Sequence, residues 1–209
     1  MDSDAWDARY AASELVWSAD PNRWVAAELA ELRPGRALDL ATGEGRNAIW
    51  LASRGWTVTA ADFSKVALDK GRRIAESLDD EEGSPSGRIH WLEADVFEHV
   101  PEPGGYDLVL ICYLQVPAGP RRTVVRRAAE ALAPGGVLLV IGHDSTNLTD
   151  GVGGPQYPEV LFTPDDIVAD LAMSGTTIRI DKAERVRREV PGEARPAIDA
   201  LVRAVALGE

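Results

Sequence analysis

Apolar residues gather in four short runs that are nearly continuous rather than alternating. The runs are Ala37–Ala41, Thr57–Ala61, Leu108–Cys112 and Val137–Ile141. Strands of a parallel sheet are covered on both faces, so their sequences read as unbroken apolar runs. A further candidate, Arg88–Glu93, alternates more and is expected nearer an edge. The pattern predicts a mostly parallel sheet.

Helical patterns with recognisable ends lie between these runs. Asp20, Ser64 and Thr163 are expected to cap helices, the first and last with a proline directly after the cap. The apolar positions at helical spacing are Val25, Leu29 and Leu32; Ala67, Gly71, Ile74 and Leu78; Val124, Ala128 and Ala131; and Ile167 and Leu171. Pro134-Gly135-Gly136 is expected to close the third helix before the next strand. Strands that alternate with helices predict βαβ units and a doubly wound α/β fold with helices on both faces of the sheet.

Three stretches break this alternation. Residues 79–87 are charged and small, which is typical of a surface loop. Residues 143–162 form a long connection, and loops of that length in a compact domain usually have a function. Thr176–Glu209 is compatible with a terminal β-hairpin. No domain linker interrupts the pattern, so residues 1–209 are expected to form a single domain.

Composition narrows the class of protein. The chain has 209 residues and a formal charge of −12, which argues against nucleic acid or an anionic membrane as the main partner. Its single cysteine, Cys112, excludes an internal disulfide. The acidic start lacks the profile of a signal peptide, and no apolar run approaches the roughly 20 residues of a membrane span. We therefore expect a cytoplasmic protein.

The most informative segment is the turn after the first predicted strand. Gly43 and Gly45 allow the chain to turn sharply and allow a ligand to approach the backbone. Asp62 follows 19 residues after Gly43, at the end of the second predicted strand. A carboxylate at that position can accept hydrogen bonds from two ribose hydroxyls. Together these features predict a site for an adenosine-containing ligand.

Asp39 separates two classes of such ligand. A dinucleotide fingerprint would have a third glycine where this chain has Ala48, although alanine is tolerated in some of those sites. Asp39, four residues before Gly43, would repel a pyrophosphate but suits a cationic ligand and its amino group. The turn therefore favours a cationic cofactor over a nicotinamide dinucleotide.

Several motifs occur in one order along residues 5 to 175. They are Trp6-Asp7-Ala8-Arg9-Tyr10, the turn Asp39–Ala48, Ala61-Asp62-Phe63-Ser64, Glu93-Ala94-Asp95-Val96, Tyr106-Asp107-Leu108-Val109 and Leu132-Ala133-Pro134-Gly135-Gly136. In this the chain resembles class I S-adenosylmethionine-dependent methyltransferases, specifically the small-molecule branch related to tellurite-resistance and thiopurine methyltransferases. The resemblance implies a seven-stranded, Rossmann-like sheet and an N-terminal helical lid over residues 1–33.

The resemblance also assigns the cofactor site, with S-adenosylmethionine as cofactor and S-adenosylhomocysteine as product. Asp39 and the backbone of Ala41, Thr42, Gly43 and Gly45 would hold the methionine part. Asp62 would hold the ribose, and Arg46 could pair with the cofactor carboxylate or be a solvated surface residue. The remaining expected contacts are Phe63, Asp95 and Val96 around the adenine, Tyr10 and Trp17 in the lid, and Cys112, which is more readily explained as a buried small apolar residue.

Acceptor chemistry is expected at the ends of the fourth and fifth strands, because ligands of open α/β sheets bind beyond the carboxyl ends of strands. His143 is the candidate general base, and Tyr113 is a further catalytic candidate. Asp144 is a third candidate because it follows His143 directly, although neighbouring side chains in a strand point to opposite faces. Gln115, Asn147 and Tyr157 are candidate substrate contacts under the loop 143–162. A metal held by Asp144 and Asn147 is a minority alternative, and no metal is expected.

These features favour an enzyme that methylates a small molecule, most readily a hydroxyl of a sugar or other polyol, because a neutral alcohol needs a base. Nitrogen, sulfur and metalloid acceptors stay open, and a non-catalytic cofactor-binding subunit is the alternative from another class. Two basic clusters, at Arg121–Arg127 and Arg179–Arg188, read as solvated faces or a subunit contact rather than nucleic-acid sites. A monomer or homodimer without a membrane partner is expected.

Overall fold

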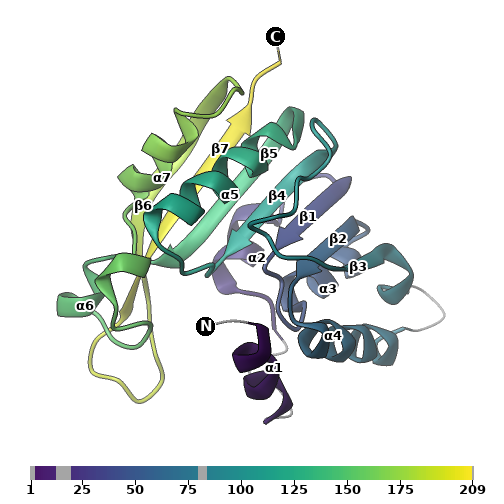
Figure 1. Ribbon diagram of the computed structural model, residues 1–209, viewed down its shortest axis with the longest axis horizontal. Coiled ribbons are helices and arrows are strands. Elements are labelled where there is room, and N and C mark those ends of the chain that lie inside the picture. Colours follow the sequence, from purple (N-terminus) through teal and green to yellow (C-terminus); the bar gives the residue numbers. More distant parts are fainter. Residues whose placement is uncertain (1–2, 13–19, 80–83, 209) are drawn as a thin grey trace. The chain divides into compact units, whose positions relative to one another are not determined.

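The computed structural model describes residues 3–12, 20–79 and 84–208 of the chain (Figure 1). It consists of two compact units, Met1–His99 and Val100–Glu209. None of its helices, within the described residues, is both long and apolar enough to cross a membrane.

The first unit is built on three parallel strands in the order β3-β2-β1. They are β1 (Arg36–Leu40), β2 (Thr57–Asp62) and β3 (Ile89–Glu93). The continuous apolar runs form β1 and β2, which are buried along most of their length, whereas β3 is buried fully only at Ile89. The alternating segment is therefore the outer strand of this unit, as its pattern predicted.

The helices of the first unit are α1 (Ser3–Ala11), α2 (Arg23–Leu29), α3 (Arg46–Ser53) and α4 (Lys65–Ser77), with the short η1 (Ser86–Arg88). The expected cap of α4 is confirmed, because Ser64 Oγ accepts a hydrogen bond from the backbone N–H of Ala67 at 3.1 Å. Leu78, expected on the buried face of α4, is 54% exposed because the helix ends at Ser77.

The predicted cap of α2 was wrong. Asn22 rather than Asp20 caps this helix, since its side-chain oxygen accepts from the backbone N–H groups of Trp24 at 2.9 Å and Val25 at 3.4 Å. Asn47 of α3 in turn accepts from the backbone N–H of Asn22 at 2.9 Å. The start of α2 is therefore fixed to α3, a contact that local sequence does not contain.

The second unit contains β4 (Tyr106–Cys112), β5 (Leu132–His143), β6 (Ile178–Arg188) and β7 (Ala197–Ala206) in the order β4-β5-β7-β6. β4 and β5 are parallel, and the other two pairs are antiparallel. The expected terminal hairpin is confirmed as β6 and β7. Pro134-Gly135-Gly136, expected before the strand, lies within β5, where the pairing with β4 shifts register.

The helices of this unit are α5 (Ala118–Glu130), α6 (Asn147–Asp150) and α7 (Pro164–Leu171), with the short η2 (Pro158–Val160). α7 opens with the expected cap, completed by a reciprocal hydrogen bond between Thr163 and Asp166. α5 and α7 lie side by side over one face of the strands (Figure 1). Both helices bury their apolar stripe against that face, which makes the core of the unit.

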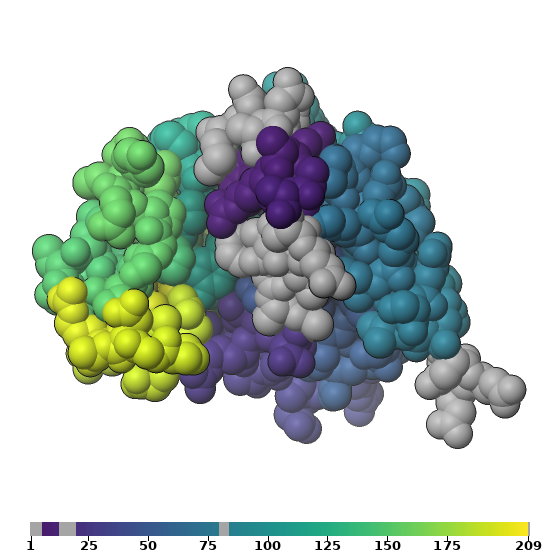
Figure 2. All heavy atoms as spheres, turned by 90° about the horizontal axis from the view of Figure 1, so that it is seen from below, coloured from purple at the N-terminus to yellow at the C-terminus, as the bar shows by residue number. Residues whose placement is uncertain are grey.

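The long loop 143–162 contains α6 and η2 and lies at one end of the strands (Figure 1). The turn between β6 and β7 lies against it, yellow beside green in Figure 2. Arg195 in this turn donates to the carbonyl oxygen of Thr149 at 2.8 Å. Loop and turn therefore form one surface of the second unit.

Candidate functional site

The turn after β1 has the backbone conformation that its glycines predicted. Gly43 and Gly45 have φ values of 59° and 76°, and Ala41, at 58°, also lies in the left-handed region. A Cβ at Gly45 would stand 2.4 Å from the ring of Trp91, so this position requires glycine for space as well. A non-glycine residue at positive φ stores strain, which is typical of functional turns. The turn therefore holds a defined, tight backbone at the end of β1.

Asp39 is buried directly behind this turn. Its carboxylate accepts from the hydroxyl of Thr42 at 2.7 Å. Burial raises the pKa of Asp39 to about 7; the Thr42 hydrogen bond and the charge of Arg46 oppose this shift, and the charge of Asp62 adds to it. A cation beside this carboxyl would stabilise its ionised form. A cationic ligand is also the class that the sequence predicted.

Asp62 lies at the end of β2 and is 7% exposed. One oxygen accepts from the backbone N–H of Gly43 at 2.8 Å and the other from that of Ser64 at 2.9 Å. Burial raises the pKa of Asp62, and these two N–H groups oppose the shift. Since a carboxylate oxygen has two lone pairs, each can accept one further hydrogen bond. The structure thus brings Asp39, Asp62 and the glycine turn together.

The other expected cofactor residues of the first unit lie as follows. Phe63 is half-buried directly after Asp62, and Val96 is 4% exposed. Asp95 is exposed and accepts from the backbone N–H of Phe97 at 2.8 Å. Arg46 is the first residue of α3. Their roles in cofactor binding stay predictions.

Of the expected lid residues, Tyr10 is buried in α1 and Trp17 lies outside the described residues. The ring of Tyr10 stacks on Trp6 with centroids 5.5 Å apart. Its backbone oxygen accepts from the ammonium of Lys70, which also lies 3.4 Å from Glu44 in the glycine turn. α1 is thus attached, through one lysine of α4, to the turn that holds Asp39.

A polar cluster forms in the second unit around His143, at the carboxyl end of β5. The Nδ1 atom of His143 lies 3.3 Å from Oδ1 of Asp199. Oδ2 of Asp199 accepts from the hydroxyl of Tyr113 at 2.7 Å and from Nε of Arg188 at 3.1 Å. The rings of Tyr113 and His143 are 4.9 Å apart. The structure therefore brings together two of the three predicted catalytic residues.

Asp144, the third, is not the partner of His143. Its buried carboxylate accepts from the backbone N–H and hydroxyl of Thr146 at 2.8 and 2.7 Å and lies 2.9 Å from Nε of Arg185. Consecutive strand residues point to opposite faces, so Asp144 faces away from the imidazole. Asp199, 56 residues after His143, takes that place.

Two of the predicted substrate residues, Gln115 and Asn147, form hydrogen bonds with backbone groups. Gln115 accepts from the N–H of His143 at 2.6 Å and donates to the carbonyl of Val160 at 2.7 Å. Asn147 accepts from the N–H of Ile198 at 2.7 Å and donates to the carbonyl of Gly153 at 2.9 Å. These two side chains hold the loop 143–162 in place. Tyr157 is 66% exposed on that loop, and its role stays a prediction.

Two smaller expectations change. Cys112, read as a buried apolar residue, is only half-buried at the end of β4. Asp144 and Asn147, the alternative metal ligands, are engaged with Arg185 and with backbone groups. No group of three or more His, Cys, Asp or Glu side chains within residues 3–12, 20–79 and 84–208 is arranged to hold a metal ion.

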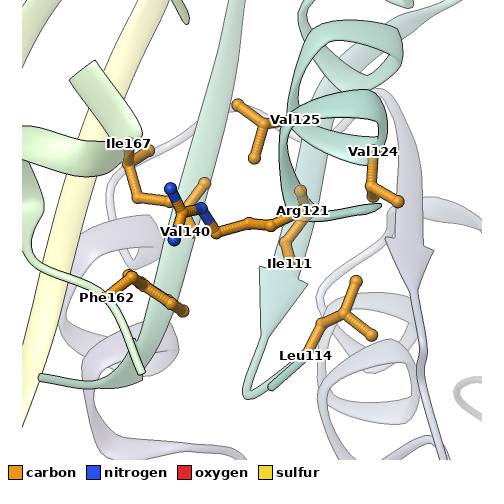
Figure 3. Close-up of a pocket in the computed structure, with 8 residues that line it drawn as sticks. All are labelled: Ile111, Leu114, Arg121, Val124, Val125, Val140, Phe162 and Ile167. Carbon is orange, nitrogen blue, oxygen red and sulfur yellow. The ribbon is translucent and has the colours of Figure 1, made fainter. Parts of the chain in front are cut away.

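Two hollows of the second unit are lined by residues other than His143. One is a core cavity of about 10 Å³ between α5, α7 and the strands, shown in Figure 3. Into it points the guanidinium of Arg121, which pairs with Asp170 at 2.8 Å. This space holds at most about one water molecule. The other, an open polar hollow of about 310 Å³, lies between α6, the loop after it and the β6–β7 turn.

Residues 37–136 match the family of methyltransferase domains. Over these residues the chain is similar to methyltransferase domains. The match covers the glycine turn, Asp62 and Asp95. It supports the expected class of enzyme, a methyltransferase, and with it the expected cofactor, S-adenosylmethionine.

A curated relative is the tRNA 5-carboxymethoxyuridine methyltransferase of Escherichia coli (strain K12), 34% identical over 123 residues, which are 57% of this chain and 45% of the relative. The chain spans about half the length of the first curated relatives it matches. The name of this relative includes a nucleic-acid acceptor, so the comparisons do not separate small molecules from nucleic acids as acceptors.

Solved structures confirm the α/β fold class. One, from work on the conversion of a disulfide bond into a thioacetal group during echinomycin biosynthesis, has a TM-score of 0.72 at 20% identity and covers 98% of this chain and 92% of its own. Magnesium protoporphyrin IX methyltransferase from Synechocystis PCC 6803, solved with bound S-adenosylmethionine, has a TM-score of 0.61 at 18% identity and covers 97% and 78%. The narrower likeness to tellurite-resistance and thiopurine methyltransferases is not supported by these comparisons.

Proposed function

We propose that this chain transfers the methyl group of S-adenosylmethionine to a hydroxyl group of a small acceptor, a sugar or another polyol, with His143 as general base. The carrying observation is the position of His143, which ends β5, is 14% exposed and faces the buried carboxylate of Asp199. A histidine held at one nitrogen by a carboxylate is suited to accept a proton at the other.

The residues of the first unit fit the cofactor. Asp39 would pair with its cationic amino group, and the spare lone pairs of Asp62 would accept from the ribose hydroxyls. Arg46, at the start of α3, would pair with its carboxylate. When bound, S-adenosylmethionine supplies a methyl group activated by a positively charged sulfur.

The chain then has one chemical task, which is to make the acceptor nucleophilic. The acceptor oxygen would bond to the methyl carbon as the bond from that carbon to sulfur breaks, and the hydroxyl proton would pass to Nε2 of His143. Aligning the acceptor and excluding water would supply the rest of the acceleration.

Formation of S-adenosylhomocysteine tests this proposal. We would screen sugars and polyols beside a thiol, an amine, tellurite and bulk tRNA. We expect turnover with a hydroxyl compound, and a fall of about 100-fold or more in His143→Ala. His90→Ala, exposed on β3, is the matched control and should keep full activity.

Other outcomes would select the alternatives. Turnover only with the thiol, amine or tellurite would assign an S-, N- or metalloid methyltransferase. Turnover only with tRNA would extend the likeness to the relative that bears that name. Cofactor binding without turnover would favour a non-catalytic subunit. Full activity of His143→Ala would remove this residue from the mechanism.

A further inference from the structure

Strand register brings the partners of His143 to one face of the second unit. Asp199 of β7 lies directly opposite His143 in the β5–β7 pair and opposite Val186 in the β6–β7 pair. Arg188 follows Val186 by two residues, so its side chain leaves β6 on the same face. A carboxylate near the start of the largely apolar strand β7 is thus set between an imidazole and a guanidinium.

The two oxygens of Asp199 face different partners. Oδ2 accepts from the hydroxyl of Tyr113 and from Nε of Arg188, while Oδ1 faces Nδ1 of His143 at 3.3 Å. Burial opposes ionisation of this carboxyl, but the donors around it, His143 and Arg188 above all, outweigh burial and hold its pKa below the usual value. An ionised carboxylate only accepts hydrogen bonds, so Oδ1 and the Nδ1 atom that faces it can form one only when Nδ1 carries the proton.

We infer that Asp199 is the positioning residue for His143: it keeps the proton of the neutral imidazole on Nδ1 and leaves Nε2 as the proton acceptor. This inference rests on the proposed function for its catalytic meaning. Tyr113 and Arg188 occupy Oδ2 and so turn Oδ1 toward the imidazole. The 3.3 Å contact is longer than an aligned hydrogen bond, as catalytic contacts often are before a substrate tightens them.

The same geometry gives Tyr113, expected as a catalytic candidate, a different task. Its hydroxyl donates to Asp199, and burial together with the charge of that carboxylate raises the pKa of Tyr113 above its ordinary value. A phenol in this setting stays protonated. Tyr113 therefore acts as a second positioning residue rather than as a base.

Nitrogen NMR of the wild-type protein tests the inference first. The chain has three histidines, so His90→Gln and His99→Gln variants assign the His143 signals. At a pH where the imidazoles are neutral, long-range ¹H–¹⁵N spectra distinguish the protonated from the unprotonated nitrogen. We expect Nδ1 protonated in His143. Protonation on Nε2 in the wild type would overturn the inference without any variant.

Asp199→Asn gives the sharper result. Tyr113 and Arg188 both donate at the Oδ2 position, so the amide has to place its oxygen there and its NH₂ toward His143. Nδ1 then becomes an acceptor, and the proton should move to Nε2. Adding Tyr113→Phe and Arg188→Met removes both donors, frees the amide to turn and should restore the proton to Nδ1.

Arg187→Met is the matched control for Arg188→Met, since Arg187 is the exposed neighbour on the opposite face of β6. It should leave the tautomer unchanged. An Asp199→Asn protein that is folded by its thermal midpoint yet keeps the proton on Nδ1 would contradict the inference. If this variant does not fold, the wild-type spectrum decides.

These spectra need neither acceptor nor cofactor, so they fail separately from the proposed function. A tautomer as expected, with full methyl transfer in His143→Ala, would leave Asp199 as the residue that orients His143 and reject His143 as the base. Protonation on Nε2, together with loss of methyl transfer in His143→Ala, would keep His143 as the base and reject the assignment of Asp199.

Discussion

Asp39 is a buried carboxyl whose ionisation a cationic ligand would change. Its pKa, raised by burial to about 7, means that a large fraction of the carboxyl is protonated at neutral pH. A cationic amino group placed beside it would favour the ionised form. Binding of such a ligand is therefore coupled to release of a proton.

Affinity for S-adenosylhomocysteine should consequently depend on pH. Because binding needs the ionised form of Asp39, the affinity should rise with pH through about 7 and be roughly tenfold weaker at pH 6 than at pH 8. Calorimetric titrations at several pH values measure this directly. In Asp39→Asn binding should be weaker throughout and lose this dependence, and an equally steep dependence in the variant would assign it to another group.

The same shift has a consequence for stability without ligand. A carboxyl with a raised pKa in the folded state favours folding below its unfolded value of 3.8, and this contribution is lost as the pH rises through about 7. Asp39→Asn should therefore raise the thermal midpoint at pH 8 more than at pH 5. Equal changes at the two pH values would contradict the burial of an ionisable group here.

At this scale the sequence predicted the tight turn after β1 and the place of Asp62 beside it, but not the partner of His143. The turn is local, so Asp39, Gly43 and Gly45 are visible within seven residues. Asp199 follows His143 by 56 residues, and the two meet only because β5 pairs with β7. One signal was available: Asp199 is the lone carboxylate in the otherwise largely apolar run Ala197–Ala206, where an unpaired charge would be costly.

Among the elements, α5 contains a buried arginine that the helical periodicity of its apolar residues could have predicted. Four arginines on this helix were read as solvated, yet Arg121 is buried and pairs with Asp170 of α7, whereas Arg122 pairs with the same carboxylate from a 44% exposed position. Arg121 lies at helical spacing from the buried Val124 and Ala128, which is the signal that separates it from its neighbours.

Urea unfolding of two arginine variants tests this difference. Arg121→Leu should cost about 3 kcal/mol, because it leaves the buried Asp170 with only a half-exposed partner. Arg122→Leu, on the same helix and with the same partner, should cost less than about 1 kcal/mol. Equal losses in the two variants would mean that burial of Arg121 does not set its contribution.

The side chain of Trp91 lies close to two glycines, Gly45 at the start of α3 and Gly71 within α4. A Cβ at Gly71 would stand 2.5 Å from its ring and 2.8 Å from the carbonyl oxygen of Glu44. Alanine normally favours a helix over glycine, but here it has no room. Packing therefore outweighs helix propensity at this position.

Gly71→Ala should lower the free energy of unfolding by roughly 1–3 kcal/mol. Gly119→Ala, in α5 with open space around its added Cβ, is the matched control and should be neutral or stabilising by up to about 1 kcal/mol. Shortening Trp91 to leucine should reduce the cost of Gly71→Ala, a non-additivity that a double-mutant cycle measures. Additive effects would contradict the contact.

For the molecule as a whole, the alternation of apolar runs with capped helices was enough to predict the fold class, and the ordered motifs predicted the similarity to methyltransferases that residues 37–136 show. Acceptor choice was not predictable in the same way. Two of the proposed acceptor contacts, Gln115 and Asn147, hold the loop 143–162 through backbone groups that sequence spacing cannot reveal. A shared fold does not carry substrate identity.

Thermal unfolding with S-adenosylhomocysteine tests the central claim most directly, with NAD and buffer as controls. At about 100 times Kd a ligand that binds only the folded state stabilises it by about 2.7 kcal/mol, which should raise the midpoint by roughly 5–10 °C in a chain of this size. We predict this rise with S-adenosylhomocysteine alone and its loss in Asp62→Ala. A rise with NAD instead, or no rise with either compound, would contradict the assignment of the glycine turn and of the chemistry proposed around His143.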